Sequence, residues 1–559
     1  MTITLLRCAM SGLLAAAVLA SSGLAAPAIL DRIPASSGPI LAVSSLKTLD
    51  ENAGQLMASI EFPAADSISE LLTVMGLADG LNMNGSAAVV WPQDAVAEAL
   101  GGGRVLMLIP TTPDGRFLAS LGAKPDGDLL RVDYNGATYY ARALEPTLLA
   151  ISATKEIVSN FTLEKGRSAE RLAAVGQRGR TIADEADILL LAAGDGVRPV
   201  LDLAMTPIRQ GLASASMVMG RPTGGAPAEM SRDFVDRVVD QTQAAIIGLR
   251  TGPLGARVDL FAEFKEGSEL AGLTAGRHDS PDLIAAMPRR EYLLLASTDL
   301  SHPVMRALIG DAIARPADAV EQPTDPLRLM QAMDAGAVAM YAPAGALMTE
   351  GVLTSTVVTW QADQPAQAAR AFRRLLETTA PAAGNGADPA GKAGFSYTPG
   401  ALTLADTQID SWTVWPDPAR PGASNPFLTG QTPGMRGYIA TSGTRGFITT
   451  GHNQSLLTDS IRPRAGQTLA DDLMLTQINE MLPSRAAVRW AINLKPLLQQ
   501  AAPMIRMFTR SDLELPDELP PIAGALALED GGLHGGMYLP APLLKVAVTV
   551  YRAQQERAR

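Results

Sequence analysis

The clearest pattern in the chain is a short apolar run that leads into a helix with one apolar face, over Tyr292–Ile309. The run Leu293–Leu295 is too short for a helix and predicts a buried strand. Asp299 is a residue type that caps helices well, and apolar residues recur beyond it at three- and four-residue spacing. Pro303 falls in the first helical turn, where proline is tolerated. The stretch therefore predicts a strand followed by a helix capped at Asp299.

The same order of strand, cap and helix occurs near the start of the chain, at Pro39–Leu49. There Ser45 takes the place of Asp299. Two weaker copies begin at Asp187 and Ala487. We therefore expect four related strand-to-helix junctions.

These copies predict a tandem duplication of the chain, over residues 29–275 and 281–559. In this interpretation Ser45 corresponds to Asp299, and Asp195 corresponds to Asn493. All four residues are expected to lie where a helix begins, because Ser, Asp and Asn side chains accept hydrogen bonds from the first helical N–H groups.

Other apolar runs predict shorter elements between these junctions. Strands are expected at 85–91, 104–109, 129–134, 137–142, 148–152, 247–250, 256–263, 337–341, 352–360, 401–404, 409–415, 436–440, 522–529 and 533–538. Helices are expected at 114–121, 155–163, 234–246 and 365–377, and from Pro542 onward. Asn135-Gly136 joins two of the strands, and this dipeptide strongly favours a hairpin turn.

The predicted fold class is α+β, with a mostly antiparallel sheet covered by amphipathic helices in each half. Two stretches rich in Ala, Gly and Pro, at about 380–394 and 416–434, predict flexible insertions in the second half.

The N-terminus predicts an export signal over residues 1–28. Arg7 precedes a short apolar segment, and small residues then allow cleavage after Ala25 or after Ala28. The sequence holds one cysteine, Cys8, which lies within this signal. The mature protein is therefore expected to be periplasmic or secreted, without a disulfide, a thiol nucleophile or a cysteine metal ligand.

The net charge of −11 argues against nucleic acid as a partner, because binding phosphate needs clustered cations. Apolar residues make up 47% of the chain and charged residues 18%, which favours a globular protein with sizeable cores. No segment after the signal is long and apolar enough to predict a membrane span.

Two Ser-x-x-Lys matches, Ser44 to Lys47 and Ser152 to Lys155, resemble the motif of penicillin-binding proteins and serine β-lactamases. The companion Ser-Asp-Asn and Lys-Thr-Gly motifs are absent from the sequence. Because Ser and Thr commonly cap helices at such junctions, we interpret both matches as structural.

The four histidines, His278, His302, His452 and His534, have no second histidine at helical spacing for a zinc pair. The glycine run Gly101–Gly103 favours an ordinary loop, because it lacks the lysine of a phosphate-binding loop.

An acidic stretch lacks the alternation of a calcium loop; its members are Asp512, Glu514, Asp517 and Glu518. Glycosylation sequons occur at Asn160 and Asn453, both within expected helical elements. We therefore predict no catalytic, cofactor-binding or metal-binding residue, and no cofactor.

With these motifs in hand, the chain resembles a broad class of uncharacterised exported bacterial proteins. The resemblance lies in the dipeptides Ile33-Pro34 and Met287-Pro288 ahead of strands, in Ser152–Ile157, and in Ser268 after the closing strands. It implies the α+β fold and export, and it implies no catalytic residues.

Three functions are compatible with these observations. The favoured one is a non-enzymatic binding or envelope-interaction protein, since the duplicated pattern brings no polar constellation with it. The second is a periplasmic carrier of an apolar, lipid-like ligand, suggested by the 22 methionines. The third is a hydrolase whose site would show as a Ser–His or carboxylate pair within hydrogen-bond reach.

Overall fold

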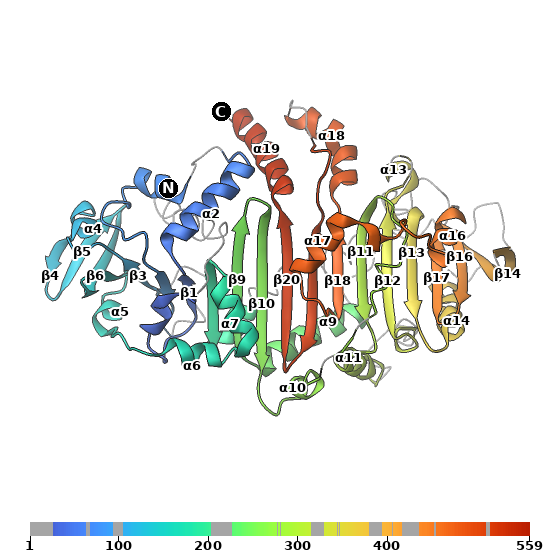
Figure 1. Cartoon of the computed structure of the whole chain (residues 1–559), viewed down its shortest axis with the longest axis horizontal. Coiled ribbons are helices and arrows are strands. Elements are labelled where there is room, and N and C mark those ends of the chain that lie inside the picture. The colour runs from blue at the N-terminus through green and yellow to red at the C-terminus, as the bar shows by residue number, and fades with distance from the viewer. Residues whose placement is uncertain are drawn as a thin grey trace. The chain divides into compact units, whose positions relative to one another are not determined.

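The computed structural model describes residues 26–62, 67–92, 104–202, 226–276, 278–279, 281–314, 329–343, 345, 347–379, 394–404, 406–415, 435–451, 454–509 and 515–558. Its helices and strands are drawn in Figure 1. The chain forms two compact units. Unit 1 comprises Met1–Met205, Val238–Gly272 and Gly531–Arg559, and unit 2 comprises Thr206–Arg237 and Leu273–Asp530.

Unit 1 contains one antiparallel sheet, in which the strands follow the order β4-β5-β6-β7-β3-β2-β1-β8-β9-β10-β20. Its strands are β1 (Ile40–Val43), β2 (Ala87–Val90), β3 (Leu106–Pro110), β4 (Lys124–Asp126), β5 (Leu129–Tyr134), β6 (Ala137–Glu145), β7 (Leu148–Ser152), β8 (Ile188–Ala193), β9 (Thr242–Gly252), β10 (Gly255–Phe264) and β20 (Gly532–Pro540). The last of these comes from the C-terminal end of the chain and pairs with β10 along its whole length.

Helices cover both faces of this sheet around β8. Leu189 packs with Ile182 of α7, whereas the neighbouring Ile188 packs with Leu49 of α2. Successive strand residues point to opposite faces, so α2 and α7 lie on opposite sides. The helical elements of unit 1 are η1 (Ala28–Asp31), α2 (Leu46–Ser59), α3 (Ile68–Val74), α4 (Arg116–Ser120), α5 (Lys155–Asn160), α6 (Ser168–Ala173), α7 (Gly176–Glu185), η3 (Gly194–Gly196) and α19 (Ala541–Ala558).

Unit 2 also contains an antiparallel sheet, in the order β14-β15-β16-β17-β13-β12-β11-β18-β19. Its strands are β11 (Tyr292–Asp299), β12 (Ala335–Tyr341), β13 (Thr356–Gln361), β14 (Gly394–Leu404), β15 (Thr407–Trp415), β16 (Met435–Ser442), β17 (Arg445–Thr450), β18 (Val488–Ile492) and β19 (Ile522–Glu529). The order can be followed in Figure 1.

The helical elements of unit 2 are α11 (Pro303–Ala314), α13 (Leu347–Glu350), η5 (Val352–Ser355), α14 (Pro365–Thr379), α16 (Gln454–Ile461), η6 (Leu469–Asp471), α17 (Leu473–Met481) and α18 (Lys495–Thr509). Two more helices, α9 (Ala226–Gln241) and α10 (Glu269–Leu273), run across the limits of the two units.

Tryptophans in unit 2 lie over glycines of the neighbouring strand. The cross-strand pairs are Trp360 with Gly446, Trp412 with Gly437, and Trp490 with Gly524. In each pair, a Cβ atom added to the glycine would meet the indole ring at less than the normal contact distance. The missing side chain therefore makes room for the ring, an arrangement that gives a glycine in a strand something to pack against.

These observations confirm the α+β class and the antiparallel sheets. The turn at Asn135-Gly136 is also confirmed, with positive φ values of 49° and 79° between β5 and β6. The proposed halves, residues 29–275 and 281–559, differ from the compact units in two main segments: residues 206–237 belong to unit 2, and residues 531–559 belong to unit 1.

Several predicted element boundaries are wrong, among them the end of the helix predicted over 155–163, which ends at Asn160, and the start of the strand predicted at 401, which begins at Gly394. The helix expected to reach residue 246 ends at Gln241, and β9 begins at Thr242. Residues Ala244–Ile246 are fully buried in this strand, so the apolar run that extended the helical pattern belongs to the sheet. The strand expected from residue 352 begins at Thr356, after the single turn of η5.

Two of the four predicted helix-entry residues, Ser45 and Asn493, lie just before helices. Ser45 is the N-cap residue of α2, and its Oγ accepts the N–H of Thr48 at 3.3 Å. Asn493 precedes α18, and its Oδ1 accepts the N–H of Lys495 at 3.0 Å. Asp195 lies within η3.

Asp299 is not the N-cap residue of α11. It is the last residue of β11, and α11 begins with Pro303. Its carboxylate instead accepts hydrogen bonds from the turn between the two elements. An Asp side chain bonds its own backbone two residues on as readily as it caps a helix, and the sequence pattern does not distinguish the two.

In the described part of the chain, no helix combines the length and the apolar character that a membrane span requires.

Candidate functional site

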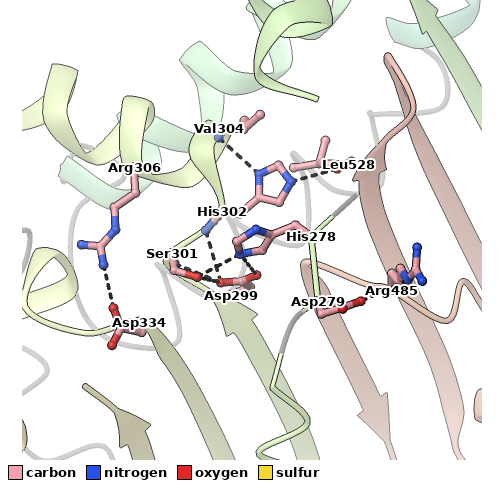
Figure 2. A network of polar contacts seen from close by, with 10 residues as sticks. All are labelled: His278, Asp279, Asp299, Ser301, His302, Val304, Arg306, Asp334, Arg485 and Leu528. Atoms are coloured by element: carbon pink, nitrogen blue, oxygen red, sulfur yellow. Dashed lines mark hydrogen bonds and ion pairs between the residues drawn. The ribbon is translucent and has the colours of Figure 1, made fainter. Parts of the chain in front are cut away.

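A cluster of polar side chains in unit 2 lies between the end of β11 and the start of α11 (Figure 2). Asp299 ends the strand, Ser301 and His302 form the turn, and His278 approaches from the segment that follows α10. We call these four residues the β11 turn cluster. Sequence reasoning missed it as a cluster, because His278 is separated from the turn by a buried strand.

Asp299 lies at the centre of the β11 turn cluster with a side chain that is 0% exposed. Its Oδ1 accepts the N–H groups of Ser301 and His302 at 3.0 and 3.2 Å, and also the Ser301 hydroxyl at 2.7 Å. A buried carboxylate is tolerated when several donors surround it, as here.

One nitrogen of the His278 ring lies close to both Asp299 and Ser301. Its Nε2 is 3.1 Å from Oδ2 of Asp299 and 3.0 Å from Oγ of Ser301. The side chain is 35% exposed, so it forms the solvent side of the cluster. The His278 ring therefore covers the buried carboxylate of Asp299 on the side that faces solvent.

His302 is buried and fully hydrogen bonded. Its Nε2 lies 2.8 Å from the carbonyl of Leu528, and its Nδ1 accepts the N–H of Val304 at 3.2 Å. Burial lowers the pKa of His302, because a desolvated imidazole resists protonation. The ring meets that of His278 edge to face at 5.3 Å, so the two imidazoles pack as apolar surfaces.

Two ion pairs flank the β11 turn cluster (Figure 2). Asp279, next to His278, lies 3.2 Å from Arg485, just before β18. Arg306 of α11 lies 3.0 Å from Asp334, just before β12. Residues 278 and 279 are thus held to unit 2 by two contacts, His278 with Asp299 and Asp279 with Arg485.

The β11 turn cluster contains a serine, a histidine and an aspartate, but not in the geometry of a catalytic triad. A triad places the carboxylate on one imidazole nitrogen and the serine on the other. Here both partners meet Nε2, and the Ser301 hydroxyl donates its proton to Asp299. The arrangement holds a turn together and leaves the serine unactivated.

Both Ser-x-x-Lys matches are also structural. The Ser152 hydroxyl donates to the carbonyl of Val105 at 2.6 Å, and Lys155 pairs with Asp126 at 3.0 Å. The Ser44 hydroxyl donates to the carbonyl of Ala186 at 2.8 Å.

Lys47 lies 3.7 Å from Glu51, with both side chains exposed. Each lysine is therefore paired with a carboxylate, and each serine hydroxyl donates to a backbone carbonyl.

Unit 1 contains a polar group around His534, whose partners spacing along the chain does not predict. Nδ1 of His534 in β20 accepts a hydrogen bond from Nη1 of Arg178 in α7 at 3.2 Å. Burial, together with the charges of Arg178 and Arg257, lowers the pKa of His534 to about 4. The imidazole is therefore neutral near pH 7.

Asp259 of β10 lies near His534 in the pairing of β10 with β20, and Asp259 is 1% exposed. Its Oδ1 accepts from Arg257 at 2.7 Å, and its Oδ2 lies 3.5 Å from Arg250. Burial raises the pKa of Asp259 in spite of these two cations. Arg257 lies two residues before Asp259 in β10, whereas the pairing of β9 with β10 brings Arg250 to the same carboxylate, which spacing in the sequence does not reveal.

Among the described residues, no three His, Cys, Asp or Glu side chains lie together as a metal ion would require. A cavity in unit 2, of about 10 Å³, is lined by residues that include Met287, Val357 and Phe447. This volume admits about one water molecule and no acyl chain.

Several sequence motifs lie outside the described residues. These are residues 1–25 of the signal, Gly101–Gly103, His452, Asn453, Asp512, Glu514, and the insertions at 380–393 and 416–434. Asp517 and Glu518 lie in the described connector before β19, and Asn160 ends α5.

Comparisons with known proteins give little to add to this geometry. No protein-family model matches the chain, and no curated protein matches it. A solved structure titled "Structure of crystal form I of TP0453" is similar to 48% of this chain and to 98% of its own length. The sequence identity is 9% and the TM-score is 0.21, so this likeness carries no argument about fold or function.

Proposed function

We propose that this protein is exported to the periplasm or secreted, where it acts by binding another protein and not by catalysis. The observation that carries this proposal is the exposure of three large apolar side chains in unit 1. Phe62 is 37% exposed, Leu254 is 73% exposed and Tyr551 is 56% exposed. We call these three residues the apolar rim.

Two members of the apolar rim lie near the start of α19, and Tyr551 lies ten residues further along that helix. Leu254 is at the tip of the β9–β10 turn, and its carbonyl accepts the N–H of Ala541 at 2.9 Å. Ala541 packs against Ile60, two residues before Phe62. Along α19, Leu544 and Val548 pack on the same α2 residues, and Tyr551 continues that helix face by one turn.

Exposed apolar side chains that gather in one place commonly mark protein interfaces, whereas scattered ones need no explanation. Aromatic residues are also enriched at the centres of such interfaces. The apolar rim therefore supports a protein partner of complementary, mostly apolar surface.

The binding proposal is tested with Leu254→Glu and Phe62→Glu variants of the mature protein. Each is cross-linked in an envelope extract, and the captured partner is purified and titrated by calorimetry. We expect at least a tenfold loss of affinity, because a buried charge in an interface is costly.

The matched control is Val74→Glu on α3, where the native side chain is 81% exposed. This control should bind like the native protein. Equal affinity of all variants would show that the apolar rim is not the binding surface.

A hydrolase is the second candidate, and one observation favours it: Ser301 Oγ lies within 3.0 Å of His278 Nε2. Purified mature protein is screened on esters, peptides, phosphates and glycosides, with Ser301→Ala and His278→Gln variants alongside. Turnover that disappears in either folded variant would establish a catalytic site. We expect no turnover, since the serine proton goes to Asp299.

An apolar-ligand carrier gains no support from the cavity in unit 2, which has room for water only. Mass spectrometry of lipids extracted from the purified protein tests this alternative, and a stoichiometric lipid would reinstate it.

We also infer that the two sheets arose by duplication. In each unit a backbone N–H at the end of the first strand donates to the carbonyl of the residue just before a later strand. The N–H of Ser44, which follows β1, donates to Asp187 before β8 at 3.0 Å, and the N–H of Asp299, which ends β11, donates to Ala487 before β18 at 2.8 Å. This register pairs Asp299 with Ser44, one residue before Ser45. An experimental structure tests the inference by superposing β1 and β8 on β11 and β18, and a different register on superposition would refute it.

A further inference from the structure

The first described residues of the chain are packed into unit 1. Ile29, Leu30 and Ile33 are 3%, 0% and 0% exposed and belong to the main core of that unit. Pro27 is also buried, and Ala26 packs against the same core. The segment 26–33 is thus a structural part of the folded unit.

Backbone hydrogen bonds fix this segment from its first residue. The N–H of Ala26 donates to Oδ1 of Asp184 at 3.0 Å. The Leu30 N–H donates to the carbonyl of Pro27 at 3.0 Å, which closes the turn of η1. The Ile29 N–H donates to Oγ of Ser86 at 2.9 Å.

The sequence allows signal cleavage after Ala25 or after Ala28, since both have small residues at the required positions. These contacts distinguish the two sites. Cleavage after Ala28 would remove buried Pro27 and would place a charged amine on Ile29, which is 3% exposed. A buried, incompletely solvated charge is strongly unfavourable.

Cleavage after Ala25 has the opposite effect. It would leave the η1 turn intact and place the new amine at Ala26, whose nitrogen already lies 3.0 Å from a carboxylate. We propose that the export signal is cut between Ala25 and Ala26, and that Asp184 receives the new N-terminus as an ion pair. This inference rests on the proposed export.

The reaction is hydrolysis of one amide bond by a host signal peptidase, with water as the co-reactant. Ala25 leaves with the new carboxylate, and the nitrogen of Ala26 becomes an amine that takes up a proton. Asp184 lies in the last turn of α7, where the helix dipole disfavours a carboxylate. An ammonium group beside it offsets that charge.

Intact-mass measurement of the protein from the envelope fraction tests the cleavage site. We expect a chain that begins at Ala26. A chain that begins at Ile29 would overturn this inference and leave export standing, whereas a chain that retains Met1 would overturn the export proposal itself.

Two substitutions separate the sites further. Ala25→Leu should block normal processing, because a large residue is not accepted beside the cleaved bond. Ala28→Leu is the matched control: Ala28 is exposed in the folded unit, so the change is tolerated and processing should be unchanged. Blocked processing in Ala28→Leu, with normal processing in Ala25→Leu, would assign the other site.

The role of Asp184 is tested by acylating the terminal amine of the mature protein at pH 7. An ion pair keeps the amine protonated and unreactive, so Asp184→Asn should react faster by roughly threefold, the strength of an exposed pair. Equal rates would show that Asp184 does not hold the N-terminus.

Discussion

Single residues in this protein do structural work that their sequence motifs only partly indicate. Asp299 stands in a capping position by its spacing, yet its carboxylate serves the turn before the helix and the ring of His278. His534 looks like an isolated histidine in the sequence, and strand pairing places it beside Arg178. Distances along the chain could not predict either set of partners, because both depend on contacts made across the fold.

Substitution of Asp299 by Ala should destabilise the protein by about 3 kcal/mol, more than the ~1 kcal/mol of a lost cap, because several buried donors lose their acceptor. The free energy of unfolding in urea measures this. Asp279→Ala, which removes only an exposed ion pair with Arg485, should cost less than ~1 kcal/mol. Similar losses for the two variants would contradict the central position of Asp299.

The buried imidazole of His534 should make stability depend on pH. Its pKa is about 4 in the folded chain, and an unfolded histidine has a pKa near 6.5. Below pH 6.5 only the unfolded state binds this proton, so stability should fall as the pH drops toward 4, by about 3 kcal/mol. Comparison of native and His534→Gln proteins in urea at pH 7 and pH 4.5 measures this difference. An unchanged pH dependence in the variant would refute it.

At the scale of elements, short apolar runs predicted most strands, and the Asn135-Gly136 dipeptide predicted the hairpin between β5 and β6. The boundary at Thr242 was misplaced because the apolar residues of a helix and of a buried strand follow one another without a turn residue. The pairing of tryptophans with glycines could not be predicted, because it depends on strand register. The sequence therefore predicts the types of the elements but not which strands lie side by side.

The tryptophan–glycine pairs predict that Gly446→Ala damages unit 2. A Cβ at Gly446 would overlap the fully buried Trp360 ring, so we expect a loss of about 2–3 kcal/mol from overpacking. Gly336 is the matched control, since it faces Trp360 from the other neighbouring strand. Its added Cβ would meet only Leu300, at 3.9 Å. Urea unfolding followed by tryptophan fluorescence should show a much smaller change for Gly336→Ala.

At the scale of the whole molecule, the repeated strand-to-helix pattern predicted related α+β regions but not which segments share a unit. The C-terminal strand β20 pairs with β10 from Gly255–Pro540 to Glu263–Gly532 and so completes the sheet of unit 1. A contiguous division of the sequence misses this pairing, because no local signal marks which distant strand will pair with β10.

Truncation after residue 530 should therefore weaken unit 1 although the deleted residues are last in the chain. Hydrogen exchange measured by mass spectrometry should show loss of protection in β10, since its N–H groups on that side lose their acceptors. Strands β12 and β13 should keep theirs. Unchanged protection of β10 would contradict the pairing.

The pairing of β10 with a strand near the C-terminus also affects the chain while it is being synthesised. Residues 265–531 are made after β10 ends and before β20 begins. At ~5–20 residues per second, this interval lasts roughly 13–50 s. Throughout it, β10 presents an unpaired edge, which is a template for aggregation. A nascent chain of this protein therefore needs to be kept apart from its copies until its last thirty or so residues arrive, and a prematurely terminated product carries a permanently open edge.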